Sequence, residues 1–257
     1  MNNNKINFVL LLTACIEPTQ FKNKVQRNDS LVRLGDYKEA LKMWLHHKDE
    51  KITTVIFAEN SGYNLTEIEH VFLTENKFNR KYQIFQALAS EVPNGLHYGY
   101  SELELIDDAI NQISLLKDND YIIKSTGRVY FPKISLLTQK FLNTQVFIAD
   151  SRRFNFFIWH KNYVLSNLFI FNIKWYKNNL LAKKEIMINL KISHFETLLF
   201  YLFNNKQSSE SIILRFPFNI NPVGVGAHWD VNYQSFNKKL SYIIRAIFRK
   251  ILPQVWI

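Results

Sequence analysis

The sequence predicts an α/β fold in which a mostly parallel sheet is flanked by helices. Two observations lead to this prediction. Strand-length apolar runs alternate with segments of helical apolar spacing through the N-terminal half, and polar residues follow each run. The chain has 257 residues, 47% of them hydrophobic, which is enough to bury one substantial core. We therefore expect a single domain over residues 1–257.

The predicted order begins with a strand, a helix and a second strand. Ile6 to Ala14 and Ile52 to Ala58 are continuous apolar runs, typical of strands that are covered on both faces. Residues 33–46 between them carry apolar side chains at helical spacing, which predicts a helix. A further helix is expected after Asn64, because its first turn is acidic and suits the helix dipole.

A helix is also expected over residues 101–116, where Ser101 and Glu104 have the spacing of a capping box. The remaining strands of this half are expected at 82–89, 121–124 and 146–149. The second half is less regular. It contains an aromatic-rich stretch, an apolar helix, a Pro/Gly loop and a basic amphipathic helix, at 154–176, 192–203, 217–226 and 235–252 respectively.

The N-terminal apolar run has two interpretations. It is the first buried strand of the sheet, or it is a short lipoprotein signal with Cys15 as the lipidated residue. The second interpretation makes the protein an exported lipoprotein or binding module. We expect the strand, and with it a cytoplasmic protein, because the run is short for a signal and the single cysteine suits a reducing compartment.

The net charge of +10 favours anionic partners. Neither Cys/His zinc spacing nor an aromatic RNA-binding signature is present, so we expect no nucleic-acid partner. No apolar run reaches the ~18 residues that cross a bilayer. The basic amphipathic helix at 235–252 has two interpretations: it lies on the anionic inner face of the cytoplasmic membrane, or it docks on the protein core.

Seven clusters follow one another along the chain: Leu11 to Ala14, Arg27 to Asp29, Arg33 to Tyr37, Glu59 to Tyr63, Gly99 to Glu102, Lys124 to Arg128 and Asp150 to Arg152. In this order they resemble a family of glycosyltransferases from bacterial capsule and O-antigen biosynthesis clusters. The resemblance covers about the first 155 residues. It implies a GT-A-like enzyme that moves a sugar from a nucleotide-sugar donor to a surface polysaccharide or lipid-linked glycan. On this basis residues 1–155 would bind the donor and 156–234 the acceptor.

The cluster Lys124 to Arg128 departs from the GT-A pattern, in which this strand commonly ends in a D-x-D pair that holds a metal ion. The sequence therefore does not specify a cofactor. A divalent Mn or Mg ion stays an option, with Asp150 as its ligand. Lys124 and Arg128 offer a substitute, because fixed cations stabilise the negative charge that develops on a departing nucleoside phosphate. Gly127 between them would let backbone approach a phosphate.

Donor-binding residues are expected beyond the carboxyl ends of the strands, where ligands of open α/β sheets bind. Ordinary explanations compete: surface charge for the arginines, helix capping for the glutamates and a solvated turn for residues 124–128. The expected donor-binding residues are Thr13, Glu17, Arg27, Arg33, Glu59, Asn60, Lys124, Thr126, Gly127, Arg128 and Arg152.

For catalysis, a carboxylate has to accept the proton of the acceptor hydroxyl. We expect Asp150 in this role, with Glu102 and Glu196 as alternatives; a salt-bridged structural role suits Glu196 equally well. His228 and Asp230 are expected on the acceptor side. Another nucleotide-using transferase is the remaining enzymatic alternative, because phosphate-friendly residues do not specify a reaction.

Overall fold

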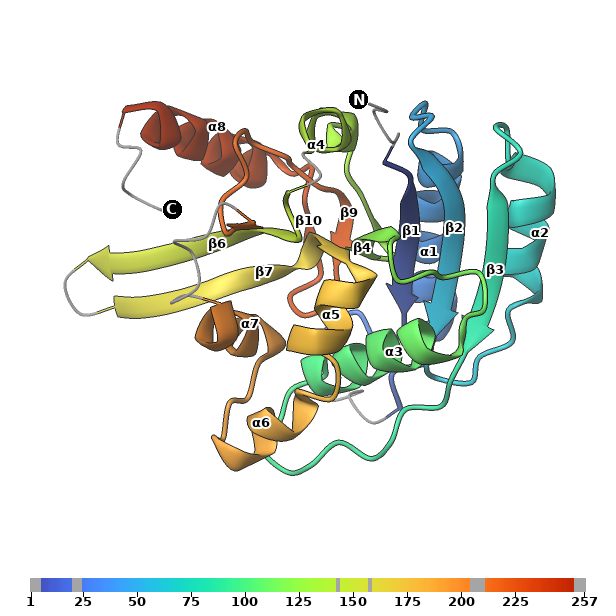
Figure 1. The fold of residues 1–257 in the computed structure, drawn as a ribbon, viewed down its shortest axis with the longest axis horizontal. Coiled ribbons are helices and arrows are strands. Elements are labelled where there is room, and N and C mark those ends of the chain that lie inside the picture. The colour runs from blue at the N-terminus through green and yellow to red at the C-terminus, as the bar shows by residue number, and fades with distance from the viewer. Residues whose placement is uncertain (1–5, 20–24, 142–143, 157–158, 204–210, 252–257) are drawn as a thin grey trace.

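A seven-stranded sheet forms the centre of the computed structural model, which describes residues 6–19, 25–141, 144–156, 159–203 and 211–251 (Figure 1). Its strands are β1 (Phe8–Ala14), β2 (Ile52–Glu59), β3 (Lys81–Gln86), β4 (Tyr121–Thr126), β6 (Phe147–Phe156), β7 (Trp159–Asn172) and β8 (Ile212–Ile213). They are ordered β3-β2-β1-β4-β7-β6-β8. β7 runs antiparallel to β4 and β6, and the other pairings are parallel. The expected mostly parallel α/β sheet is therefore confirmed.

Helices cover both faces of this sheet (Figure 1). The side chains of β1 alternate between two cores: Phe8, Leu10 and Leu12 belong to one, while Val9 and Leu11 belong to the other. The first core includes residues of α1 (Ser30–Leu45), α2 (Thr66–Glu75) and α4 (Ile134–Lys140). The second includes residues of α3 (Gly99–Gln112), α5 (Ile173–Asn179), α6 (Lys184–Asn189) and α7 (Phe195–Phe203).

The run that allowed a lipoprotein signal is the central strand β1, hydrogen-bonded to β2 on one side and β4 on the other. All seven of its residues are buried. This is the strand interpretation, and it explains the apolar run by coverage of both faces.

Three elements differ from expectation. β6 continues to Phe156, so Asp150 lies within a strand, at an irregularity of the ladder, and does not end it. The aromatic-rich stretch contains the long strand β7. Its Phe169 and Phe171 are buried in the core beside the sheet, which explains the aromatic composition. α3 begins at Gly99, and Ser101 is buried in its first turn and does not cap it. Residue 252, the expected end of the last helix, lies outside the described residues.

The C-terminal end of the expected Pro/Gly loop forms a strand, β9 (Val223–Gly226). It is the middle strand of a small second sheet with β10 (Val231–Asn232) and β5 (Val129–Tyr130). Gly224 has φ +123, and a Cβ there would lie 2.3 Å from the Arg128 carbonyl oxygen. Only glycine allows this approach. It brings β9 and the residues after it over the end of β4.

Lys124 joins three strands and a helix. Its side chain is fully buried, and its Nζ donates to Glu102 Oε1 on α3 at 2.7 Å and to the Ser166 carbonyl oxygen on β7 at 2.6 Å. Thr13 Oγ1 of β1 donates to the same Glu102 oxygen at 2.7 Å. The ammonium of Lys124 is therefore enclosed and already paired, which differs from the expected phosphate contact.

The C-terminal helix α8 (Phe236–Ile251) turns its polar side toward the protein. Its partly covered residues include Lys238, Tyr242, Arg245 and Arg249, whereas its apolar residues are exposed, from 40% for Phe248 to 78% for Phe236. None of its residues is buried, so its contact with the protein differs from the expected docking of an apolar side on the core. Within the described residues, no helix combines the length and apolar character that crossing a membrane requires.

We predict that Lys124→Met destabilises the protein by about 3 kcal/mol or more, because it leaves the Glu102 carboxylate without its cation in a low-dielectric environment. Adding Glu102→Gln should restore part of this loss, since the remaining group is then neutral. Chemical denaturation measures both values. Lys117→Met, at an exposed lysine, is the matched control. If the double variant is as unstable as Lys124→Met, the pair is not coupled as described.

Candidate functional site

A cleft of about 300 Å³ opens beyond the carboxyl ends of β1, β2 and β4. This is the edge at which open α/β sheets bind ligands. The first turn of α3, the middle of β7, the start of α7 and the β9–β10 region complete its wall, and Lys238 of α8 reaches it.

The cleft brings together many of the residues expected from sequence. Those that line it are Thr13, Glu17, Arg33, Asn60, Glu102, Thr126, Arg128, Glu196 and His228. The others lie outside its lining: Arg27, Glu59, Lys124, Gly127, Asp150, Arg152 and Asp230.

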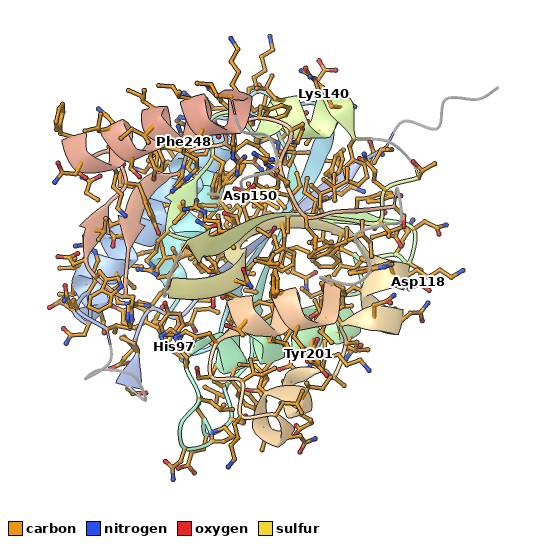
Figure 2. All side chains as sticks on the ribbon, turned by 90° about the vertical axis from the view of Figure 1, so that its left-hand side faces the viewer. His97, Asp118, Lys140, Asp150, Tyr201 and Phe248 are labelled. Atoms are coloured by element: carbon orange, nitrogen blue, oxygen red, sulfur yellow. The ribbon has the colours of Figure 1, made fainter. Side chains whose placement is uncertain are left out.

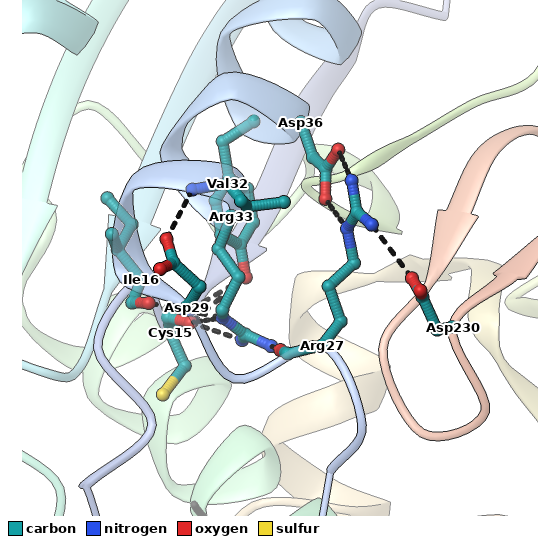
Figure 3. Close-up of polar contacts among 9 residues, drawn as sticks. Cys15, Ile16, Arg27, Asp29, Val32, Arg33, Asp36 and Asp230 are labelled. Carbon is teal, nitrogen blue, oxygen red and sulfur yellow. Dashed lines mark hydrogen bonds and ion pairs between the residues drawn. The ribbon is translucent and has the colours of Figure 1, made fainter.

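Two arginines hold the loop that follows β1 (Figure 3). Arg33 is buried and donates to the carbonyl oxygens of Cys15, Ile16 and Arg27. Arg27 forms ion pairs with Asp36 and Asp230. Because their donors contact the protein itself, these arginines shape one wall of the cleft.

Glu59 organises the neighbouring loop after β2. Its side chain is fully buried and accepts from the backbone of Ile16 at 3.1 Å, Ser61 at 2.9 Å and Gly62 at 3.0 Å. Gln86 Nε2 also donates to it at 3.1 Å. Glu59 therefore connects the ends of β1 and β2. By accepting from backbone N–H groups it acts much as the expected capping residue would.

Arg128 differs from these residues because no carboxylate among the described residues pairs with its charge, and its printed contact is with an aromatic ring. It lines the cleft and is only 8% exposed, yet its Nε and Nη1 are buried without a hydrogen-bond acceptor. The guanidinium stands over the Tyr37 ring, 5.6 Å from its centroid. An enclosed guanidinium with unused donors is suited to hold a phosphate oxygen in a bidentate contact.

Gly127, next to Arg128, serves packing. Its N–H donates to the Thr13 carbonyl oxygen at 2.8 Å, and a Cβ there would lie 3.1 Å from the Tyr37 ring. The close approach that glycine allows is therefore to β1 and α1, whereas the sequence analysis expected an approach to a phosphate.

Asp150 lies beside α8, outside the cleft lining (Figure 2). Both of its carboxylate oxygens accept from Arg249 Nη2 at 2.6 Å, and Oδ1 also accepts from the Phe216 backbone at 3.2 Å. Its side chain is thus held by an ion pair away from the strand ends. Position and pairing both differ from the expectation of a catalytic base or metal ligand there.

Three carboxylates do line the cleft: Glu17, Glu102 and Glu196. Glu102 is paired with Lys124. Glu196, in the first turn of α7, accepts from Ser166 Oγ at 2.6 Å and forms no ion pair among the described residues. Burial raises the pKa of Tyr98, another wall residue, and the negative charge of Glu196 raises it further. Of these carboxylates, Glu196 combines a cleft position with a positioned but unpaired charge.

Cys15 lines the cleft as a protonated thiol. Burial raises its pKa to about 11, and its backbone N–H donates to Tyr37 Oη at 3.0 Å. A thiol with so high a pKa is a poor nucleophile. We therefore assign Cys15 no covalent chemistry.

His228 follows β9 and packs edge-on against His97, with 5.2 Å between the ring centroids. His97 in turn stacks on His194, with 4.6 Å between their centroids. Asp230 instead pairs with Arg27 and is exposed. Sequence reasoning missed several wall residues, because nothing in their local patterns marks them: Tyr98, Ser166, Tyr233 and Lys238.

The residues at the end of β4 do not fit the metal site that a GT-A fold commonly carries there. Lys124, Ser125 and Thr126 occupy the strand end, and the nearby Glu102 is already shared by Lys124 and Thr13. No group of three or more His, Cys, Asp or Glu side chains in the described part of the chain is arranged to hold a metal ion. We derive no step through a metal.

No protein-family model and no curated protein matches the chain. Solved structures do share its architecture. The galactosyltransferase LgtC, in complex with donor and acceptor sugar analogues, aligns with a TM-score of 0.53 at 11% identity, covering 80% of this chain and 72% of LgtC. An active-site mutant of LgtC gives a TM-score of 0.53 at 10% identity with the same coverage.

The glycosyltransferase GlyE of Streptococcus pneumoniae TIGR4 aligns with a TM-score of 0.49 at 9% identity. The alignment covers 82% of this chain and 45% of GlyE, so the chain spans less than half the length of that protein. Identities this low are evidence of common architecture and not of common activity. The chain has a GT-A-like, Rossmann-like α/β fold, and its cleft lies at the edge of the sheet where that fold binds ligands.

Proposed function

We propose that the protein is a glycosyltransferase that binds a nucleotide-sugar donor in the cleft beyond β1, β2 and β4. The observation that carries this proposal is Arg128, a buried guanidinium whose Nε and Nη1 have no protein acceptor. An uncompensated buried charge is costly, and a diphosphate would supply the missing counter-charge. The GT-A-like fold and the ordered motifs of the N-terminal half support the same class of reaction.

In the transfer step, an acceptor hydroxyl oxygen bonds to the anomeric carbon while the bond from that carbon to the nucleoside diphosphate breaks. The leaving oxygen takes the bonding electron pair, and Arg128 stabilises its negative charge. Glu196 accepts the hydroxyl proton, because it is the cleft carboxylate that is positioned by Ser166 and not neutralised by a cation. This assignment replaces Asp150, whose oxygens bind Arg249.

The acceptor we propose is a surface polysaccharide or lipid-linked glycan, and the location is the cytoplasmic side of the membrane. The motif resemblance supports the acceptor, and the single cysteine suits the compartment. α8 supports a membrane surface. Its apolar side faces outward, and exposed basic residues such as Lys239 and Lys250 accompany it. Apolar burial and cationic charge together favour an anionic bilayer.

Arg128→Met should abolish stabilisation by the donor without destabilising the free protein, because it removes an unpaired buried charge. A thermal-shift screen against UDP-, GDP-, CMP- and dTDP-sugars, with and without manganese, identifies the donor. We expect the wild type and Lys133→Met, at an exposed lysine, to show the same shift. A full donor shift in Arg128→Met would contradict the proposed phosphate contact.

Glu196→Gln should lower turnover about 10²-fold or more while the donor-induced thermal shift stays unchanged, because the amide accepts no proton. Steady-state transfer with the identified donor measures the effect. Glu185→Gln, at an exposed glutamate, is the control. Turnover near that of the wild type in Glu196→Gln would move the base to another residue.

Ile243→Glu together with Ile247→Glu should release the protein from vesicles that contain phosphatidylglycerol, because charges replace apolar side chains that are 57% and 50% exposed. Co-sedimentation measures the bound fraction. Since neither residue is buried, the melting temperature should not change. Equal binding of variant and wild type would exclude this face of α8 as the bilayer contact.

A further inference from the structure

A cluster of arginines lies on the protein-facing side of α8, outside the cleft lining. Arg245 and Arg249 follow each other at i, i+4 and therefore share one side of the helix. Arg249 holds Asp150 of β6, with Nη2 2.6 Å from each carboxylate oxygen. Arg152, two residues beyond Asp150, comes from the same strand. Together these four residues are called the α8 cluster below.

The α8 cluster carries more positive charge than its single carboxylate neutralises. Arg249 uses Asp150, whereas Arg152 and Arg245 form no ion pair among the described residues. The Nε atoms of Arg152 and Arg249 are buried without a hydrogen-bond acceptor. Burial, together with repulsion from Arg152 and Arg249, lowers the pKa of Arg245 to about 10. The α8 cluster thus holds three guanidiniums and one aspartate, with donors left over.

This arrangement costs folding free energy, because like charges at i, i+4 repel and partly buried charges lose solvation. A helix that merely covered the protein would turn its apolar side inward. α8 does the opposite and places its guanidiniums against β6. Planar guanidinium forks suit phosphate oxygens in bidentate contacts.

The helix that carries Arg245 and Arg249 also carries a cleft residue and the outward apolar side. Lys238 of the same helix lines the cleft. Burial raises the pKa of Tyr233, which is also in the cleft wall, and the charges of Arg128 and Arg152 oppose that rise. A ligand at the cluster would therefore place one end toward the cleft and the other toward the exposed apolar residues.

We propose that Arg152, Arg245 and Arg249 form a second anion site that binds a phosphate or diphosphate group on an amphiphilic molecule. Resting on the proposed function, the inference is that this group belongs to a phosphate-linked acceptor or to a phospholipid headgroup beside it. The reacting end of such an acceptor reaches the cleft along Lys238, and its apolar part lies along α8.

Pyrophosphate binding to the full-length protein tests this site. Calorimetry in the Arg128→Met background removes the contribution of the cleft. Adding Arg152→Met or Arg245→Met should weaken pyrophosphate binding at least about tenfold, because each removes a charge-assisted fork. Lys239→Met, on the exposed side of α8, should have no effect. The proposal is overturned if pyrophosphate binds with equal affinity to Arg128→Met alone and to the three double variants that add Arg152→Met, Arg245→Met or Lys239→Met.

Vesicles separate the two sources of the phosphate. If Arg152→Met and Arg245→Met also release the protein from phosphatidylglycerol vesicles, the site holds a headgroup; if they weaken pyrophosphate binding alone, it holds a phosphate-linked acceptor. Neither variant should lower the melting temperature, because both remove repulsion and leave the Arg249–Asp150 pair intact. Their donor-induced thermal shift, measured with Arg128 present, should also be unchanged, so failure of the donor proposal is observed separately.

Discussion

The buried contact of Lys124 with Glu102 is the interaction on which the rest of the site depends. It connects β4 to α3, and through Thr13 and Ser166 it also connects β1 and β7. A lysine enclosed among strands is stable only if its charge is paired. That requirement fixes Glu102 in the first turn of α3, and with it the position of the cleft wall relative to the strand ends.

The charged residues around the cleft are of two kinds. Some are paired within the protein and stabilise it, and others have no ionic partner and can bind a ligand. Arg33, Arg27 and Glu59 use their polar atoms on neighbouring loops and shape the cavity. Arg128 and Glu196 keep a charge without an ionic partner among the described residues. In the proposed transfer, the guanidinium would hold a phosphate and the carboxylate would accept a proton.

The α8 cluster likewise combines a paired charge, Arg249 with Asp150, and guanidinium donors without an acceptor. The guanidiniums of α8 face β6 and its apolar residues face outward, the reverse of a helix that packs on a core. The proposed donor site, the proposed phosphate site and the exposed apolar surface therefore follow one another from the cleft outward.

The sequence by itself determined the alternation of strands and helices, because apolar runs such as that of β1 report coverage on both faces. It also placed Arg128 and Asn60 at the ligand edge, since polar residues after parallel strands meet there. Only the tertiary structure decided which charges are used internally. Lys124 and Asp150 meet Glu102 and Arg249, partners 22 and 99 residues away, and no local pattern encodes such contacts. Pairing across the fold, and not position along a strand, separates structural charges from those left for a ligand.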